Sequence, residues 1–301
     1  MSAEQPVTSV APVDRVTDEW TVKRILDWTT EHLKKHGSDS ARLDAEILLA
    51  HARGCKRIEL YTRYDEPLTE RQRALMRDLV RRRANAEPVA YLVGFKEFFS
   101  LPFKVTPDVL IPRPETETLV LEAVEIAKAS TAERLTLLDL CTGSGCIAVA
   151  ATKATVKFST TATDMSEPAL AIARRNAASI GVVERIEFRH GDLFDALPAD
   201  SIFDVIVSNP PYVSDGEYET LAPDIRLHEP ANALLAGADG MDVLRRIAAE
   251  APQRLNFGGH LLVELDPAQA NSFSNMLRPS FRDVRIVKDL AGLPRVVHAM
   301  K

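Results

Sequence analysis

Apolar residues recur every three or four positions through the first quarter of the chain, which is the period of helices that pack on one side. Val22, Ile25, Leu26 and Leu33 fall on one such face, and Gly37 ends that pattern. We expect a small helical bundle over residues 19–87, after a flexible tail over residues 1–18. Two further helices are predicted inside it, one between a Ser38-Asp39-Ser40 cap and Gly54 and one opened by the capping box of Thr69 with Gln72.

From residue 88 onward the pattern of apolar positions changes. A short hairpin is predicted over Phe95–Val105, inside a linker over residues 88–110, and Pro102 makes one of its arms an edge strand. A helix should follow from Pro114 to about Ala129, because proline suits the first helical position.

Beyond residue 130, short apolar runs alternate with helical stretches. Such alternation is typical of a mostly parallel sheet with helices on both faces. Two runs at the end of the chain have no helix between them and predict an antiparallel edge pair. We therefore expect an α/β, Rossmann-like domain over residues 111–301. The predicted strands are Leu135–Leu140, Phe158–Thr163, Arg185–His190, Phe203–Ser208, His260–Leu265, Phe281–Val287 and Arg295–Met300, and the clearest helices are Pro168–Ser179 and Met241–Pro252.

Composition narrows the class of protein. The 301 residues are 46% hydrophobic and carry a net charge of −6, as in an ordinary globular protein of about two domains. No run approaches the roughly 20 apolar residues of a membrane span. Three cysteines, Cys55, Cys141 and Cys146, form no CxxC pair and argue against disulfides or structural zinc. The start of the chain lacks the basic and apolar regions of a secretory signal. We expect a cytoplasmic monomer that uses no membrane and no metal.

A glycine loop, Asp139-Leu-Cys-Thr-Gly-Ser-Gly145, joins a buried-type strand to a helix. In a doubly wound sheet a nucleotide-like ligand binds at this turn. Asp164 ends the next strand, where it can accept from ribose hydroxyls, and Asp192 follows the third, where it can accept from an adenine amine. The loop lacks the third glycine of GxGxxG, so the pattern favours S-adenosylmethionine (SAM) over a dinucleotide. Three carboxylates, Asp139 included, also suit a sulfonium cation. A tight turn without a ligand remains the alternative.

The segment Ser208-Asn-Pro-Pro-Tyr212 follows the fourth strand, at the sheet edge where such folds do chemistry. The side-chain oxygen of Asn209 and the carbonyl of Pro210 can together accept both hydrogens of an NH₂ group. Tyr212 offers a ring face to a planar group. Asn209, Pro210 and Tyr212 are therefore candidate catalytic residues, and Asn209, Pro210, Pro211 and Tyr212 are candidate substrate-binding residues. A rigid proline loop without a function is the alternative.

The chain resembles the release factor glutamine methyltransferases (PrmC/HemK) from about residue 20 to its end. The matching segments are Arg42-Leu-Asp-Ala-Glu-Ile-Leu-Leu49, Pro88-Val-Ala-Tyr-Leu92, Leu110-Ile-Pro-Arg-Pro-Glu-Thr-Glu117, Thr142-Gly-Ser-Gly-Cys146, Val207-Ser-Asn-Pro-Pro-Tyr212, His228-Glu-Pro230 and Asp289-Leu-Ala-Gly-Leu-Pro-Arg295.

This resemblance implies a class I SAM-dependent methyltransferase that modifies N5 of the glutamine in the Gly-Gly-Gln motif of peptide chain release factors. It also implies a helical N-terminal domain that helps to bind the release factor. Three positions depart from the family pattern: Cys141 replaces a glycine, Leu193 stands where some relatives have tryptophan, and Glu264-Leu-Asp266 replaces Glu-Ile-Gly. The cofactor site should comprise Cys141, Thr142, Gly143, Ser144, Gly145, Asp164, Asp192, Leu193 and Asn209.

Two other functions remain open from the residues alone. A DNA adenine N6-methyltransferase also uses Asn-Pro-Pro-Tyr, but it predicts a basic face for DNA and an insert for target recognition. The net charge of −6 and the compact N-terminal region supply neither, so no direct nucleic-acid contact is expected. A non-catalytic protein that binds SAM or a release factor would have no need of a loop that orients an amine.

Overall fold

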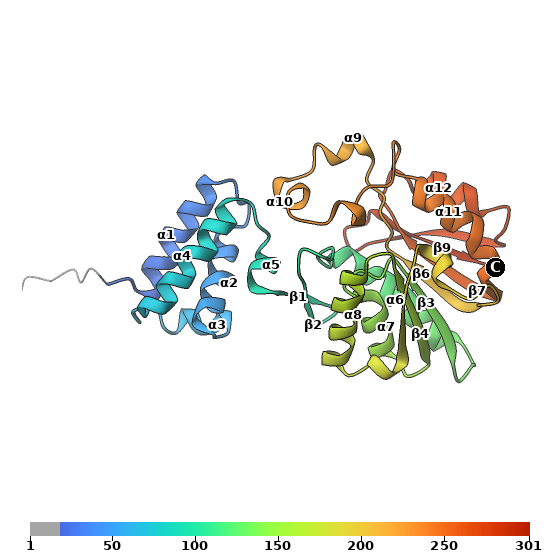
Figure 1. Cartoon of the computed structure of the whole chain (residues 1–301), viewed down its shortest axis with the longest axis horizontal. Coiled ribbons are helices and arrows are strands. Elements are labelled where there is room, and N and C mark those ends of the chain that lie inside the picture. Colours follow the sequence, from blue (N-terminus) through green and yellow to red (C-terminus); the bar gives the residue numbers. More distant parts are fainter. Residues whose placement is uncertain (1–18) are drawn as a thin grey trace, which may run out of the picture. The chain divides into compact units, whose positions relative to one another are not determined.

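The computed structural model describes residues 19–301 (Figure 1). The predicted tail over residues 1–18 lies outside the described residues. The chain divides into two compact units, with the boundary between Asn85 and Ala86. Across the described residues, no helix combines the length and the apolar character that a membrane crossing requires.

The first unit is a helical bundle in which the three predicted helices are present. Thr21 caps the first helix, and the capping box of Thr69 with Gln72 forms at the start of the last. A buried carboxylate, Asp44, joins the helices by accepting hydrogen bonds from Ser38, Ser40 and Arg83. A short helix at residues 57–61 was not predicted from the sequence. The helices are α1 (Val22–Lys35), α2 (Ala41–Arg53), α3 (Arg57–Tyr61) and α4 (Glu70–Ala84).

The second unit contains a seven-stranded sheet in the order β5-β4-β3-β6-β7-β9-β8. The first five strands of this order are parallel, and β9 pairs antiparallel with both β7 and β8. The predicted mostly parallel sheet with an antiparallel C-terminal edge is therefore confirmed. The strands are β3 (Leu135–Leu140), β4 (Phe158–Asp164), β5 (Ile186–His190), β6 (Phe203–Ser208), β7 (Leu255–Glu264), β8 (Asp283–Lys288) and β9 (Pro294–Met300).

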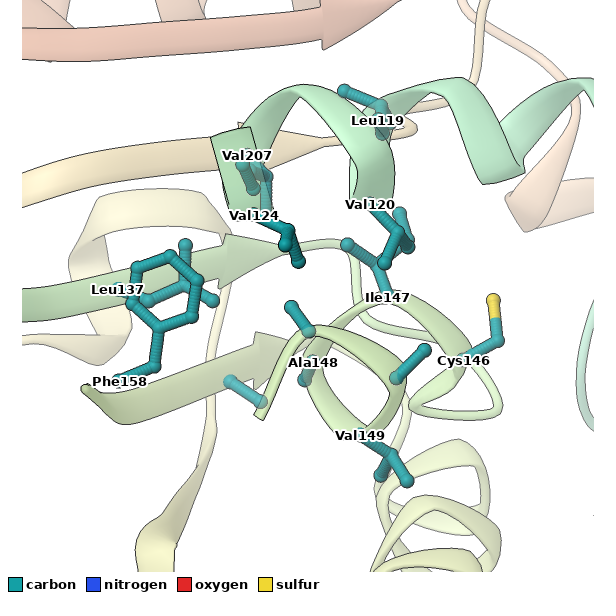
Figure 2. Packing of buried hydrophobic residues seen from close by; sticks show 14 of the residues in the cluster. Leu119, Val120, Val124, Leu137, Cys146, Ile147, Ala148, Val149, Phe158 and Val207 are labelled. Atoms are coloured by element: carbon teal, nitrogen blue, oxygen red, sulfur yellow. The ribbon is translucent and has the colours of Figure 1, made fainter. Parts of the chain in front are cut away.

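Helices cover both faces of this sheet because neighbouring residues of each strand point to opposite sides. In β3, Leu137 packs with one apolar cluster and Leu138 with the other. Figure 2 shows the first cluster, where side chains of α6 and α7 meet Leu137, Phe158 and Val207 of the sheet. The helices are α6 (Glu117–Ala129), α7 (Cys146–Ala154), α8 (Glu167–Ile180), α9 (Asp215–Tyr218), α10 (Pro223–Arg226), α11 (Asp242–Glu250) and α12 (Ala270–Leu277).

The segment predicted to be a linker packs into the second unit. It forms a short helix, α5 (Val89–Val93), and the predicted hairpin, β1 (Phe95–Phe98) with β2 (Leu101–Lys104). Phe98 and Phe103 of the hairpin are buried in the first apolar cluster. This packing places the chain that follows, residues 108–116, beside the carboxyl ends of the parallel strands.

Candidate active site

Asp139, near the end of β3, holds the loop that follows this strand in place. This carboxylate is fully buried and accepts hydrogen bonds from the Thr142 hydroxyl (2.6 Å) and the Ala148 amide (3.0 Å). Burial raises the pKa of Asp139 to about 7. Asp139 does not line the pocket above it, so the expectation that it faces a cationic ligand was wrong. Its role in the structure is to hold the loop to the start of α7.

The same loop makes its turns with left-handed backbone angles. Cys141, Gly143 and Gly145 have φ values of +59°, +53° and +78°. A Cβ atom on Gly145 would lie 3.0 Å from the Cβ of Ala173, so glycine allows α7 and α8 to approach closely. Cys141 has this left-handed backbone angle although it carries a Cβ atom, at the position where the family pattern has glycine. Burial raises the pKa of the Cys141 thiol, which therefore stays protonated.

Acidic residues follow the next two strands, as predicted. Asp164 ends β4 and accepts the backbone amides of Gly143 and Ser166, each at 2.8 Å. Burial raises the pKa of Asp164. Asp192 follows β5 and pairs with Arg246 at 2.9 Å. Leu193 beside it is buried and has a φ of +49°.

These residues line one pocket at the carboxyl ends of the parallel strands, with about 850 Å³ of empty space including its opening to solvent. Gly145 does not line it. Two other segments also contribute to its wall, although none of their lining residues was predicted as a site residue from the sequence. They are Asp108, Val109, Leu110, Pro112, Arg113 and Thr116 in the first segment, and Pro230, Asn232 and Ala233 in the second. Glu229 joins these segments by accepting from the Ile111 amide and from Arg113. The predicted residues in its wall are Cys141, Thr142, Gly143, Ser144, Asp164, Asp192, Leu193, Asn209 and Pro211.

A second hollow adjoins this pocket. Pro210 and Tyr212 line the second hollow, and Asn209 lines both. The Nδ2 atom of Asn209 donates to Thr116 Oγ1 at 3.2 Å. Within residues 19–301, no hydrogen bond reaches Asn209 Oδ1 or the Pro210 carbonyl, so both oxygens are available as acceptors. Gln269 donates to the Tyr212 carbonyl at 2.9 Å, and burial raises the pKa of the Tyr212 hydroxyl to about 12.

The first pocket suits SAM in its chemistry. Each Asp164 oxygen accepts one backbone amide and retains a lone pair for a hydroxyl donor. The left-handed turn at Gly143 has open space where a Cβ would stand, so a ligand can approach the backbone there.

Comparison with protein families agrees with this fold and pocket. Residues 24–94 match a model described as the PrmC N-terminal domain, and residues 118–238 match one described as the methyltransferase small domain. A methyltransferase from Pyrococcus furiosus shares the fold, with a TM-score of 0.50 and 20% identity over 68% of this chain and 90% of that one. The sheet order and the pocket at its switch point define a class I SAM-dependent methyltransferase.

Similarity to whole proteins identifies the family. A release factor glutamine methyltransferase of Rhodopirellula baltica is 48% identical over 94% of this chain and 97% of its own length. Another, of Geobacter sulfurreducens, is 43% identical over 92% and 96%. The chain belongs to the release factor glutamine methyltransferase family.

Proposed function

We propose that this chain transfers the methyl group of SAM to the side-chain N5 of the glutamine in the Gly-Gly-Gln motif of peptide chain release factors. In this proposal, Asn209, Pro210, Pro211 and Tyr212 bind and orient the glutamine amide. The observation that carries the assignment is the position of Asn209, which lines both the first pocket and the adjoining hollow.

The amide nitrogen of glutamine is a weak nucleophile because its lone pair is delocalised into the carbonyl. Bound SAM supplies an electrophilic methyl group on a sulfonium centre. Asn209 Oδ1 and the Pro210 carbonyl accept the two N–H groups, hold the nitrogen facing the first pocket and draw charge from it during transfer. The new bond from nitrogen to the methyl carbon would form as the bond from that carbon to sulfur breaks, with S-adenosylhomocysteine as the leaving group. The alkylated nitrogen would then lose one proton to water. Positioning of this kind contributes roughly 7–11 kcal/mol to lowering a barrier.

The cofactor site consists of Cys141, Thr142, Gly143, Ser144, Gly145, Asp164, Asp192, Leu193 and Asn209. Asp164 would accept from the ribose hydroxyls, and Asp192 would accept from the adenine amine. Leu193 would offer the base an apolar contact, without the aromatic ring that tryptophan gives in some relatives. Gly145 acts indirectly, because it sets the distance between α7 and α8 below the loop.

Two acceptors at the substrate site also explain a choice of glutamine over glutamate. A glutamate carboxylate has no N–H donor for them, and sites built on such hydrogen bonds discriminate by about 10⁴-fold or more.

We further propose that the enzyme acts as a monomer in the cytoplasm, where translation terminates, without direct contact with nucleic acid. The net charge of −6 and the three free cysteines support this setting.

The test uses methyl-labelled SAM with a purified release factor in one reaction and duplex DNA in another. We expect label only on the release factor, at the Gly-Gly-Gln glutamine when the product is mapped by mass spectrometry. Asn209→Ala should nearly abolish this turnover and change SAM affinity moderately, as measured by calorimetry. Label on DNA alone would refute the proposed substrate, and full turnover by Asn209→Ala would remove Asn209 from the mechanism.

A further inference from the structure

The turn that joins β8 to β9, residues 289–293, presents two leucines to solvent. Leu290 is fully exposed and Leu293 is half exposed. The turn belongs to a segment that matches the family, but its residues line neither the first pocket nor the adjoining hollow. Single exposed apolar residues are common on protein surfaces, so the contacts that hold this turn and its place in the fold determine what its leucines can do.

Polar contacts hold the turn in one conformation. The side chain of Asp289 is only 5% exposed, and its Oδ1 atom accepts the amides of Ala291 and Leu293, each at 3.0 Å. Its Oδ2 atom accepts from Arg295 Nε at 3.2 Å, and the Asp289 amide donates to the Leu293 carbonyl at 2.9 Å. None of these contacts uses the side chain of Leu290. A contact surface that is ordered before binding loses less entropy when a partner docks.

The turn lies at the edge of the sheet that carries both pockets. Strand β9 pairs antiparallel with β7, with Val296 opposite Glu264, so the turn before β9 stands beside the carboxyl end of β7. On its other side β7 pairs with β6, the strand that Asn209 follows. Neighbouring strands lie about 4.8 Å apart, so β9 and β6 are separated by roughly 10 Å.

Residues 265–269, which follow β7, bridge the turn to the candidate substrate-binding residues. At one end of this segment the Leu265 amide donates to the Arg295 carbonyl at 3.2 Å. At the other end Gln269 Nε2 donates to the Tyr212 carbonyl at 2.9 Å. Direct hydrogen bonds therefore join the turn to the segment that would bind the glutamine amide.

We propose that the β8–β9 turn is a docking point for the release factor, where Leu290 and Leu293 pack against an apolar patch beside the Gly-Gly-Gln motif. This inference rests on the proposed function. A glutamine side chain is short, so the protein that carries it must lie against the edge of the sheet where its amide enters the hollow. Exposed leucines at this edge add affinity for the whole release factor without touching the reacting amide.

The experiment compares wild type with Leu290→Ser, using purified, unmethylated release factor. The readouts are the Kd of the release factor for the enzyme loaded with S-adenosylhomocysteine, measured by calorimetry, and the KM and kcat of methyl transfer. We expect Leu290→Ser to raise Kd and KM about tenfold, the effect of truncating one well-buried contact in an interface. The kcat at saturating release factor and the affinity for SAM should stay at the wild-type values.

Val156→Ser is the matched control. It removes a similarly exposed aliphatic side chain from the loop between α7 and β4, at the opposite edge of the sheet, and should leave Kd, KM and kcat unchanged. The double variant Leu290→Ser/Leu293→Ser should raise Kd and KM further than Leu290→Ser alone. Circular dichroism and SAM calorimetry verify that each variant is folded.

The outcomes separate the docking role from the proposed function. Unchanged Kd and KM in Leu290→Ser and in the double variant would overturn the docking role and leave the proposed function intact. A lower kcat or SAM affinity at unchanged KM would also overturn it, because the turn would then support the active site. A wild-type dimer in sedimentation that Leu290→Ser dissociates would assign the turn to a second copy of the chain. A wild-type enzyme that binds the release factor without methylating it would refute the proposed function alone.

Discussion

Two residues in the loops that line the first pocket have left-handed backbone angles, which glycine adopts more easily. Cys141 has a φ of +59° and Leu193 a φ of +49°, and both line the cofactor pocket. A left-handed conformation costs a residue with a Cβ roughly 1–2 kcal/mol. At position 141 the family pattern has glycine, so this chain keeps the turn with a strained residue. Such strain is found where surrounding contacts determine the backbone conformation.

We expect Cys141→Gly to be more stable than Cys141→Ala by about 1 kcal/mol. Both variants remove the thiol, but only glycine relieves the strain of the left-handed angle. The difference is smaller than the full strain because glycine also gains freedom in the unfolded chain. Urea unfolding of the two variants measures it. Equal stability of the two variants would mean that the loop stores no strain at this position.

Most residues that line the candidate site could be predicted from the sequence, but the orientations of side chains could not. Asp164, Asp192 and Asn209 follow their strands as expected, because the carboxyl ends of parallel strands meet at one edge. Asp139 also lies near the carboxyl end of its strand, but its side chain accepts hydrogen bonds from Thr142 and the Ala148 amide and does not line the pocket. The direction of a side chain depends on such tertiary partners, which no local pattern reveals.

At the scale of elements, strand positions could be predicted well because each buried strand is a short apolar run between turn residues. The predictions for β3 and β6 match the observed residues. The strand β7 begins at Leu255, five residues before the predicted start, because Asn256 to Gly259 interrupt its apolar pattern. The short helices α9 and α10 were not predicted, since four-residue helices carry too few periodic positions to be recognised.

The spacing of α7 and α8 depends on Gly145, and Gly181 provides a matched control. Both glycines have left-handed angles, +78° and +80°, but a Cβ on Gly181 meets nothing within 4 Å. We expect Gly181→Ala to cost about 1 kcal/mol from backbone strain alone. Gly145→Ala should cost more, because its new methyl group would press on Ala173 of α8.

Thermal unfolding and SAM calorimetry measure both effects. Gly145→Ala should also weaken SAM binding, since α7 begins directly after the cofactor loop, whereas Gly181→Ala should not. The same loss of stability in the two variants would show that α7 and α8 have room to separate.

At the scale of the whole molecule, two buried carboxyl groups make the stability of the fold depend on pH. Asp139 and Glu264 both lie in the second unit, and burial raises the pKa of each to about 7. In the unfolded chain such groups titrate near about 4. Between these values the folded state therefore binds more protons than the unfolded state. The stability that these groups contribute is complete below about pH 4 and decreases as the pH rises to about 7.

Glu264→Gln removes one of these titrations, because glutamine stays neutral. We therefore expect the stability of this variant relative to wild type to rise steadily between pH 5 and pH 8, when urea unfolding is followed by far-ultraviolet circular dichroism. Both tryptophans, Trp20 and Trp28, lie in the helical unit, so tryptophan fluorescence reports on that unit and serves as an internal control. A stability difference that stays constant over this pH range would mean that Glu264 titrates near its ordinary value. In that case the positive charges of Arg113 and Arg295 would outweigh the cost of burying the ionised carboxylate.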